Sequence, residues 1–302
     1  MRKTVEIVNE IAKKTSFLRE MTSDEARLLK ATLLGMYCDL YKLCEKHNIP
    51  LLMLYGSALG AVRHQGFIPW DDDIDLGVKR EDYERLKDLL LAGELGDKYS
   101  FTFPSKDKDS KNYFMKIYLK ESYFAELADL GSPFPKGIFL DVFPIERVPK
   151  SKFVRSIKGR FADLVGLMST FVLYSEYPTT EMNKFMSQTK DGRRRWRLYK
   201  LIGGIGRFMK HRKWIWLLDR LMTSTKSSDL YSLVSTSDHY KRVYKAEELF
   251  PGKQLLFEGQ KVCVPQDVEK HLVMEYGTTY MELPPPEKRL KHLIVDVKFP
   301  AK

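Results

Sequence analysis

The chain has 302 residues, 43% of them hydrophobic, which is enough for a sizeable core in one large domain or a domain with an added subdomain. It contains no apolar run of 18 residues, and its charged beginning, "MRKTVEIVNEIAKK", lacks the apolar centre of a signal peptide. The three cysteines have no metal-type spacing, so we expect reduced thiols and a cytoplasmic protein.

The positive charge is concentrated in one segment. Residues 150–220 contain 17 Lys and Arg against five Asp and Glu, whereas the whole chain carries a formal net charge of +11. The rest of the chain is therefore close to neutral. A segment that holds the entire excess needs an acidic partner or a solvated role.

The first elements alternate between helix and strand. The pattern predicts a helix over 24–46, because Thr22 and Glu25 have capping-box spacing and apolar residues recur at three and four. A buried strand is expected over 51–55, then a turn at Gly56 and Ser57, and then a short helix over 57–63 capped by Ser57. A strand over 74–78 and an amphipathic helix over 80–93 follow.

Strands dominate the next part of the chain. We expect them over 99–103, 113–119, 122–128 and 137–143, followed by helices from 151 to 221 and a final strand over 293–299. This order predicts an α+β (α/β-like) fold with a mixed sheet and flanking helices. The expected units are a catalytic core over 1–149, a basic helical lobe over 150–235, and a segment over 236–302 that returns to the core.

Four aspartates crowd the stretch "FIPWDDDIDLGVKR". On a strand, Asp71, Asp73 and Asp75 point to one face, where three carboxylates do not all ionise cheaply without a cation among them. Carboxylate oxygens suit Mg²⁺ or Mn²⁺. The competing interpretation, a solvated acidic turn, fits poorly with the apolar residues that flank and interleave the acids.

The preceding stretch "YGSALGAVR" resembles a phosphate-binding turn. A strand that ends in Gly56 and Ser57 before a helix offers free backbone N–H groups, and Arg63 adds a charged fork. Alone this signal is weak. Paired with a nearby carboxylate strand, it predicts phosphoryl transfer, in which one element grips a phosphate and the other holds a neutralising metal.

Two further residues have charge in apolar strands. Asp141 lies within "GIFLDVFPIE" and is interpreted as a third metal ligand or as the base that takes a hydroxyl proton, with a simple ion pair as the alternative. Lys116 lies within "YFMKIYL", where it either contacts a phosphate or points outward to solvent.

These motifs together resemble the signatures of the LicD family, phosphocholine transferase-like proteins of the nucleotidyltransferase-fold superfamily. The first motif runs over 55–86, the second is "GIFLDVFPIE", and residues 257–292 resemble the C-terminal signature. The resemblance implies a nucleotidyltransferase-like mixed sheet and a metal. It also implies transfer of a phosphorylated alcohol, phosphocholine or similar, from a CDP-activated donor to a cell-surface glycan hydroxyl, with release of CMP.

The resemblance also assigns roles to single residues. Gly56 and Ser57 match the turn that faces the donor phosphates, and Asp73 and Asp75 match the Asp-x-Asp metal pair. The remaining matches are an accessory acid, a third carboxylate and two residues of the C-terminal signature that are expected to close over the donor: Asp71, Asp141, Arg289 and His292.

The basic segment keeps three interpretations. Its arginines and lysines alternate with Trp196, Trp214 and Trp216, which fits a helix on an anionic membrane surface at the inner face of the membrane, or one that grips a polyanionic glycan. It also fits a solvated lobe whose tryptophans are core. No nucleic-acid motif is present, so no nucleic-acid partner is expected.

Two other functions remain open from the sequence. One is a nucleotidyltransferase that moves NMP to an acceptor, since the residues do not decide which phosphorus is attacked. The other is a non-catalytic protein that binds anionic glycans or membranes through the basic lobe. The acceptor of the favoured transferase is a glycan of the teichoic acid, lipopolysaccharide or capsule type, free or linked to a lipid.

Overall fold

The computed structural model describes residues 11, 18–129, 132–223, 225, 227–233, 242–285, 289 and 293–300. The first half contains, in order, α2 (Ser23–Lys46), β1 (Leu52–Met53), α3 (Tyr55–His64), β2 (Asp75–Lys79), α4 (Arg80–Leu91), β3 (Tyr99–Thr102), β4 (Met115–Leu119), β5 (Tyr123–Glu126) and β6 (Phe139–Arg147). A short 3-10 turn, Leu127–Asp129, follows β5.

The second half begins with four helices and returns to strands. These elements are α5 (Lys152–Glu176), α6 (Thr180–Met186), α7 (Lys190–Gly206), α8 (His211–Met222), β7 (Leu230–Leu233), β8 (Tyr244–Lys245), α9 (Ala246–Leu249), β9 (Lys253–Phe257), β10 (Gln260–Val264), α10 (Val268–Tyr276) and β11 (Ile294–Lys298). We call α5 to α8 the helical lobe.

The main sheet is mixed, which confirms the expected α+β class. Its order is β1-β2-β6-β4-β3, with β7 paired to the far end of β6 and β8 paired to β7. Strands β2 and β6 are parallel, and the other pairings are antiparallel. Strand β7 falls within the range expected for the basic lobe, yet it extends the core sheet.

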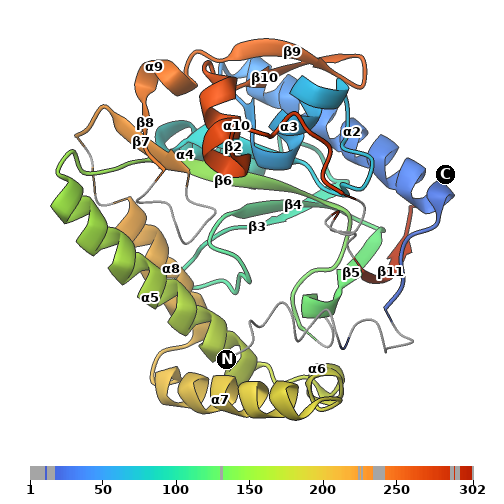
Figure 1. The fold of residues 1–302 in the computed structure, drawn as a ribbon, viewed down its shortest axis with the longest axis vertical. Coiled ribbons are helices and arrows are strands. Elements are labelled where there is room, and N and C mark those ends of the chain that lie inside the picture. Colours follow the sequence, from blue (N-terminus) through green and yellow to red (C-terminus); the bar gives the residue numbers. More distant parts are fainter. Residues whose placement is uncertain are drawn as a thin grey trace.

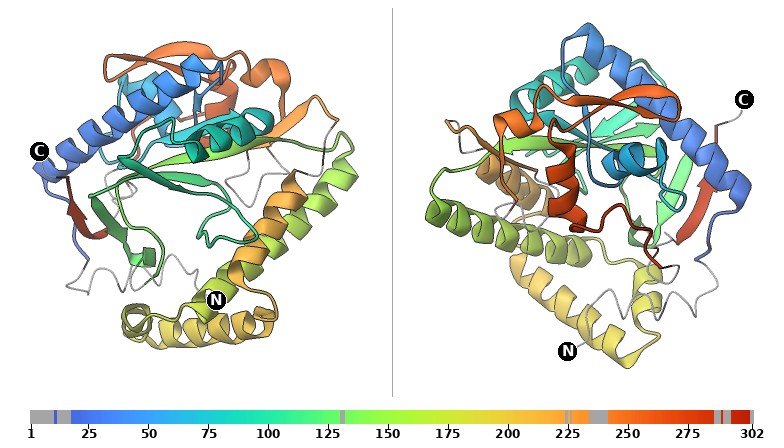
Figure 2. Two further views of the ribbon diagram at one scale, coloured as in Figure 1. Left: turned by 180° about the vertical axis from the view of Figure 1, so that it is seen from behind. Right: turned by 45° about the horizontal axis from the view of Figure 1, so that its top comes forward.

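The two faces of this sheet have different neighbours. Leu76 and Val78 of β2 and Leu140 and Val142 of β6 belong to the main core, together with residues of α2 and α4. Figures 1 and 2 show α4 on one face of the sheet and α10 on the other. The chemistry described below lies on the face opposite to the α4 side, because strand residues alternate between faces.

Local signals placed most elements correctly. Helix α2 begins with the expected capping box, in which the Thr22 hydroxyl accepts from the Glu25 N–H and the Glu25 carboxylate accepts from the Thr22 N–H. The strands expected over 113–119, 137–143 and 293–299 are β4, β6 and β11, and the helices expected from 151 onward begin with Ser151 as N-cap of α5.

The boundary between the strand expected over 51–55 and the helix expected over 57–63 lies earlier in the chain than expected. Strand β1 ends at Met53, and α3 already begins at Tyr55, with Leu54 as N-cap and no side-chain cap. Ser57 is thus not the cap. Its hydroxyl is buried against the sheet, where it accepts the Asp75 N–H at 2.9 Å. Contact with β2 overrides the local capping preference of serine.

The helical lobe projects from one side of the sheet (Figure 1). Within the lobe, α5 packs against both α7 and α8. Two glycines allow the close approach of α7, since a Cβ at Gly206 would meet Met168 and Val172 of α5 at 2.7 Å. The second, Gly203, lies against the carbonyl of Phe171.

A buried ion cluster joins the lobe to the core. Arg80, at the start of α4, donates from Nε to Glu146 of β6 at 2.7 Å and from its Nη2 to Asp219 of α8 at 2.9 Å. The Glu146 side chain is 2% exposed, and burial raises its pKa while Arg80 lowers it. The lobe is therefore attached to the sheet through a buried charge that Arg80 neutralises, with a smaller effect from Lys158 of α5.

Candidate active site

Three charged residues form a row across neighbouring strands. Asp75 of β2 lies opposite Asp141 of β6, and Asp141 lies opposite Lys116 of β4. Their sequence neighbours Leu76, Leu140 and Ile117 belong to the main core, so the three charged side chains share the other face of the sheet. Three residues predicted one by one from separate motifs are thus brought together by strand register.

Asp141 and Lys116 form a buried ion pair. The Lys116 Nζ lies 2.8 Å from Asp141 Oδ1 and donates to Oδ2 at 3.1 Å, while the same ammonium lies over the ring of Phe139 at 3.2 Å from its centroid. Burial raises the pKa of Asp141, and the Lys116 charge lowers it. Asp141 Oδ1 is paired with the Lys116 ammonium, and a carboxylate oxygen has a second lone pair that can bind a further partner.

The acidic stretch before β2 is a loop, and this corrects the expected geometry. Strand β2 begins only at Asp75, so the alternation expected for Asp71, Asp73 and Asp75 does not apply. Instead, one carboxylate oxygen from each of Asp71, Asp72 and Asp73 lies within 4.8 Å of the others. Asp72, which is 7% exposed and was not among the expected ligands, also belongs to this cluster.

The acidic loop and the row of charged strand residues interact electrostatically. Burial raises the pKa of Asp75 well above its ordinary value, and the negative charges of Asp73, Asp141 and Asp71 raise it further. Lys116 opposes this effect. The four predicted acids are therefore close enough to repel one another, and a cation among them would relieve that repulsion.

The first turn of α3 lies against this cluster. A Cβ on Gly56 would come within 2.7 Å of Asp71 Oδ2, so only glycine leaves the Asp71 carboxylate in place. The N–H groups in the first turn of a helix have no acceptor within the helix, and α3 has no side-chain cap. Because the Ser57 hydroxyl accepts the Asp75 N–H, its own proton remains to be donated.

Two buried residues hold the beginning of α3 and were not foreseen from the sequence. The N–H of Tyr55 donates to His271 Nε2 of α10 at 3.1 Å, and His271 Nδ1 lies 3.1 Å from the Tyr244 hydroxyl. Tyr55 has a φ of 46°, in the left-handed region. His271 therefore stabilises the unusual backbone that places Gly56 beside Asp71.

The acidic loop is held from outside by α2 and the β9–β10 hairpin. Lys30 of α2 donates to the carbonyls of Ile68 and Pro69 at 3.1 and 2.9 Å. Glu258 accepts the Phe67 N–H at 3.0 Å. No local signal near Lys30 or Glu258 indicated these roles, because each acts on a loop far away in the sequence.

Two more of the predicted residues, Arg63 and Arg289, lie within the described part of the chain. The Arg63 guanidinium donates to the carbonyls of Tyr280 and Glu282 at 2.7 and 3.2 Å, so it joins α3 to the C-terminal segment. Arg289 donates to the Pro284 carbonyl, and its guanidinium lies 4.8 Å from the centroid of the Trp70 ring. Trp70 directly precedes Asp71 in the sequence. His292 lies outside the described residues.

Tyr276, at the end of α10, is an additional candidate. Burial raises the pKa of its hydroxyl, and the negative charges of Asp75 and Asp71 raise it further. The phenol therefore stays protonated near the acids and can act as a hydrogen-bond donor there. The sequence offered no signal for this role beyond the resemblance of its segment to a C-terminal signature.

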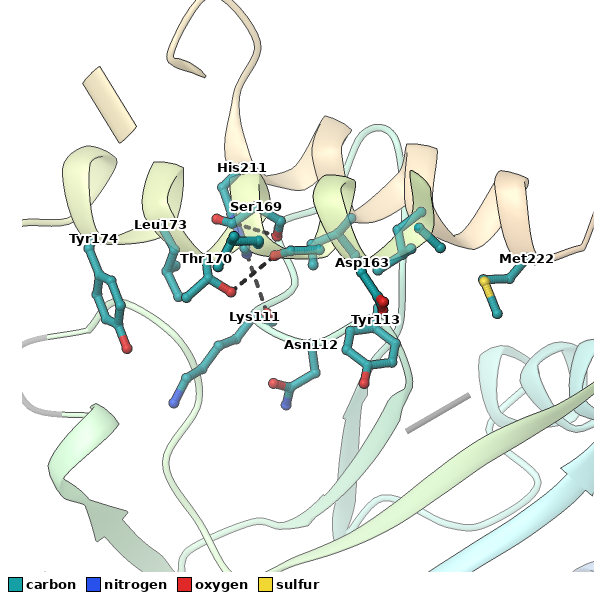
Figure 3. Close-up of a pocket in the computed structure, with 15 residues that line it drawn as sticks. Lys111, Asn112, Tyr113, Asp163, Ser169, Thr170, Leu173, Tyr174, His211 and Met222 are labelled. Atoms are coloured by element: carbon teal, nitrogen blue, oxygen red, sulfur yellow. Dashed lines mark hydrogen bonds between the residues drawn. The ribbon is translucent and has the colours of Figure 1, made fainter. Parts of the chain in front are cut away.

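A cavity of about 430 Å³ lies between the loop before β4 and the helical lobe. Figure 3 shows Lys111, Asn112 and Tyr113, from the loop before β4, under α5, with Tyr174 pointing down beside them. The positive charge of Lys111 also lowers the pKa of Asp141. Helices α5 and α8 of the lobe form one wall of the cavity, opposite the loop before β4.

The arrangement fits a divalent cation. The donor set consists of carboxylate oxygens, the type that Mg²⁺ and Mn²⁺ prefer. The Asp141 carboxylate is buried, and the acids around Asp75 repel one another. These observations are consistent with the expected ligands Asp71, Asp73, Asp75 and Asp141, with Asp72 added by the loop geometry.

Comparisons with known proteins agree with the sequence motifs. Residues 48–152 match the family described as "LicD/FKTN/FKRP, nucleotidyltransferase domain". The chain is 25% identical over 291 residues to the lipopolysaccharide cholinephosphotransferase LicD of Haemophilus influenzae, a match that covers 92% of this chain and 98% of that protein.

Two further relatives match shorter parts. The chain is 34% identical over 84 residues to the human ribitol 5-phosphate transferase FKRP, which covers 27% of this chain and 16% of FKRP. It is 32% identical over 116 residues to an uncharacterized protein of Rickettsia prowazekii, with 36% and 43% covered. The family match includes every predicted site residue from Gly56 to Asp141 and ends where the helical lobe begins. The predicted resemblance is thus confirmed.

Proposed function

We propose that this chain, a member of the LicD family, is a phosphotransferase that moves a phosphorylated alcohol onto a hydroxyl of a cell-surface glycan. The names of two relatives support this assignment, since one is a lipopolysaccharide cholinephosphotransferase and the other a ribitol 5-phosphate transferase. The observation that carries it is the row of Asp75, Asp141 and Lys116 beside the uncapped first turn of α3.

The reaction that we propose uses a CDP-activated alcohol as donor. The acceptor hydroxyl oxygen forms a new bond to the phosphorus that bears the alcohol, and the bond from that phosphorus to the bridging oxygen of CMP breaks. The hydroxyl proton passes to a carboxylate of the acidic cluster, and CMP leaves with the electron pair of the broken bond. The donor is a diphosphate ester, so the site needs positive charge and N–H donors where the phosphates lie.

The residues divide this work. A divalent cation held by Asp71, Asp73, Asp75 and Asp141 would supply charge neutralisation for the diphosphate. The N–H groups of Gly56 and Ser57 and the Ser57 hydroxyl bind phosphate oxygens, because α3 presents its positive end to the cluster. Lys116 balances the charge of Asp141 and adds a cation beside the departing phosphate.

A cytoplasmic location is part of this proposal. All three cysteines are free thiols, as expected for a reducing compartment. A CDP-activated donor would also be available in the cytoplasm. The acceptor then meets the enzyme at the stage of a glycan precursor.

The test is release of CMP by the purified full chain. The protein is given Mg²⁺, a cell-envelope glycan extract, and in turn CDP-choline, CDP-ethanolamine, CDP-glycerol and CDP-ribitol. We expect metal-dependent CMP release from one of these donors, which would name the transferred group. Asp73→Asn should lower the rate at least about a thousandfold, because an essential charge at the donor phosphates is lost.

The matched control is Asp97→Asn, which removes an exposed aspartate between α4 and β3 and should leave the rate unchanged. Release of pyrophosphate from an NTP would instead favour the nucleotidyltransferase. Equal activity of wild type and Asp73→Asn with every donor would contradict the assigned site.

A further inference from the structure

Large apolar side chains are exposed on the outside of the helical lobe. Ten of them, 45–81% exposed, lie on α5 and α7 or directly after α7. We call this set the lobe face: Phe153, Val154, Ile157, Phe161, Leu164, Leu167, Leu198, Leu201, Ile205 and Phe208. Isolated exposed apolar residues are common, but a set that gathers on two packed helices marks an interaction site.

The part of the lobe face on α5 is a true helical stripe. Positions 153, 157, 160, 164, 167 and 171 follow one another at spacings of three and four, so they lie along one side of the helix. Arg160 occupies the third of these positions, and the others are Phe153, Ile157, Leu164, Leu167 and Phe171. At Phe171 this stripe is buried by α7, whose Tyr199 ring lies 4.8 Å away. The same apolar stripe is therefore core where α7 covers it and bare where α7 does not.

Helix α7 repeats the arrangement with its own two sides. Trp196, Gly203 and Gly206 are buried on the side that packs against α5. Leu198, Leu201 and Ile205, with Phe208 just beyond, recur at three and four on the other side. A water-soluble helix that needed only to cover α5 would carry polar residues on that outer side.

Positive charge surrounds the lobe face. Arg194 precedes the α7 stripe with the same spacing, Arg193 and Arg197 lie beside it, and all three are exposed. Arg160 interrupts the α5 stripe, and Arg207 and Lys210 follow α7, again exposed. An apolar stripe bordered by Arg and Lys is the pattern of helices that lie in a membrane interface.

We propose that the lobe face binds the surface of an anionic lipid bilayer. The apolar side chains would enter the boundary between headgroups and acyl chains, and the arginines would contact lipid phosphates. A second copy of this chain fits less well, because a symmetric contact would place the same arginines against one another. A glycan would match the cations and leave the apolar side chains in water.

The binding is peripheral. Within the part of the chain that the structure describes, no helix combines the length and the apolar character that crossing a bilayer requires. Two of the three tryptophans singled out in the sequence are engaged within the lobe, since Trp196 is buried with its Nε1 donating to Asn183 and Trp214 donates to carbonyls of Gly206 and Met209. The contact is made by aliphatic residues and phenylalanines instead.

The test is flotation of the full chain with vesicles. We expect the wild type to float with vesicles of equal parts phosphatidylcholine and phosphatidylglycerol, and much less with phosphatidylcholine alone. Raising the salt from about 0.1 M to about 0.5 M should weaken binding, because screening reduces the charge attraction. The double variant Ile205→Asp/Phe208→Asp should lower the bound fraction at least about tenfold.

The matched control is Leu256→Asp on β9. Leu256 is 52% exposed, as apolar as the replaced residues, and lies outside the lobe face, so this variant should float like the wild type. Thermal unfolding of each variant checks that the fold is intact. Arg194→Gln/Arg197→Gln should reduce binding to the anionic vesicles and leave the weak binding to neutral ones unchanged.

Wild type that fails to float with anionic vesicles, or a double variant that floats as well as wild type, would overturn the proposal. Sedimentation of the wild type as a dimer that the double variant dissociates would assign the lobe face to a second copy instead. The proposal does not depend on the proposed function. CMP release from soluble substrates can persist when flotation fails, and flotation can persist in Asp73→Asn.

Discussion

Two regions of the molecule depart in opposite ways from the usual rule that charged side chains are exposed and apolar ones buried. One is the sheet face that carries Asp75, Asp141 and Lys116, and the other is the outer face of the helical lobe. At the sheet, charged groups are buried and lie close to like charges. On the lobe, large apolar side chains are exposed to solvent beside arginines. Neither arrangement is favourable for an isolated folded chain.

The difference shows what each region needs from outside. Buried acids that repel one another are stabilised by a cation, and the cation attracts a phosphate. An exposed apolar stripe with flanking cations is stabilised by an anionic apolar boundary. The composition of each region thus indicates the kind of partner that would stabilise it. The Arg80 cluster joins the two regions.

The largest effect should come from breaking that junction. Arg80→Met removes the cation that neutralises buried Glu146 and contacts Asp219, so we expect the free energy of unfolding to fall by about 3–5 kcal/mol. Urea unfolding measures this change. Adding Glu146→Gln should recover part of the loss, because the uncompensated buried charge is then removed.

The control on the same helix is Arg85→Met. Arg85 is 55% exposed and pairs with Asp82 at the surface, so its removal should cost less than about 1 kcal/mol. If both variants lose the same small amount, the lobe is not attached through the Arg80 cluster.

A smaller effect should come from acid, because His271 is buried beside the beginning of α3. Burial, and next the charge of Arg242, lower the pKa of His271 from 6.5 to about 3 in the folded chain. Below pH 6.5, His271 is protonated in the unfolded chain but neutral in the folded chain. The free energy of unfolding therefore falls as the pH falls. Between pH 7 and pH 5 this one residue should cost about 2 kcal/mol.

Urea unfolding of wild type and His271→Gln at both pH values isolates this contribution, since other titrating groups cancel in the difference. The variant should lose about 2 kcal/mol less than the wild type over this range. The lobe has a buried histidine of its own, His211 of α8, whose pKa burial lowers, and its contribution is present in both proteins and cancels in the difference. Equal acid sensitivity of the two proteins would show that His271 is not held neutral.

The smallest effects come from one methyl group added in each region. Gly56→Ala pushes on the Asp71 carboxylate, and we expect at least about a tenfold fall in kcat/KM for CMP release, equivalent to about 1.4 kcal/mol. Gly204→Ala lies on α7, where the nearest atom to a new Cβ is Ser175 Oγ at 3.9 Å. It should stabilise the chain by about 0.5–1 kcal/mol and leave the rate unchanged. A rate equal to wild type in Gly56→Ala would separate α3 from the site.

Much of the site was predictable because its signals are local. A glycine before a helix, aspartates among apolar residues, and a lysine inside a strand each indicate chemistry within a few residues of sequence. Gly56, Asp75, Asp141 and Lys116 were found this way, and the structure brings them together. Asp71, Asp73 and Asp75 do act on one another as expected, but residues 71–74 form a loop instead of a strand and Asp72 joins them, because local composition did not distinguish loop from strand.

The supporting residues could not be found from the sequence. Lys30, Glu258 and His271 act on segments 38, 191 and 216 residues away, and Arg80 reaches Asp219 across 139 residues. None of them carries a motif, since a buried histidine or a helix lysine has many ordinary roles. Their functions arise only from packing.

Most elements of the first half, the mixed sheet and the acids of the site could be inferred from the sequence, because hydrophobic periodicity, caps and short motifs are properties of neighbouring residues. The tertiary structure decided the rest. Strand register aligned Asp75, Asp141 and Lys116, the packing of Gly203 and Gly206 against α5 decided which part of an apolar stripe is core, and the remainder stayed exposed. Which side chains meet, and which remain uncovered, depends on contacts between segments far apart in the chain, and no local pattern encodes those contacts.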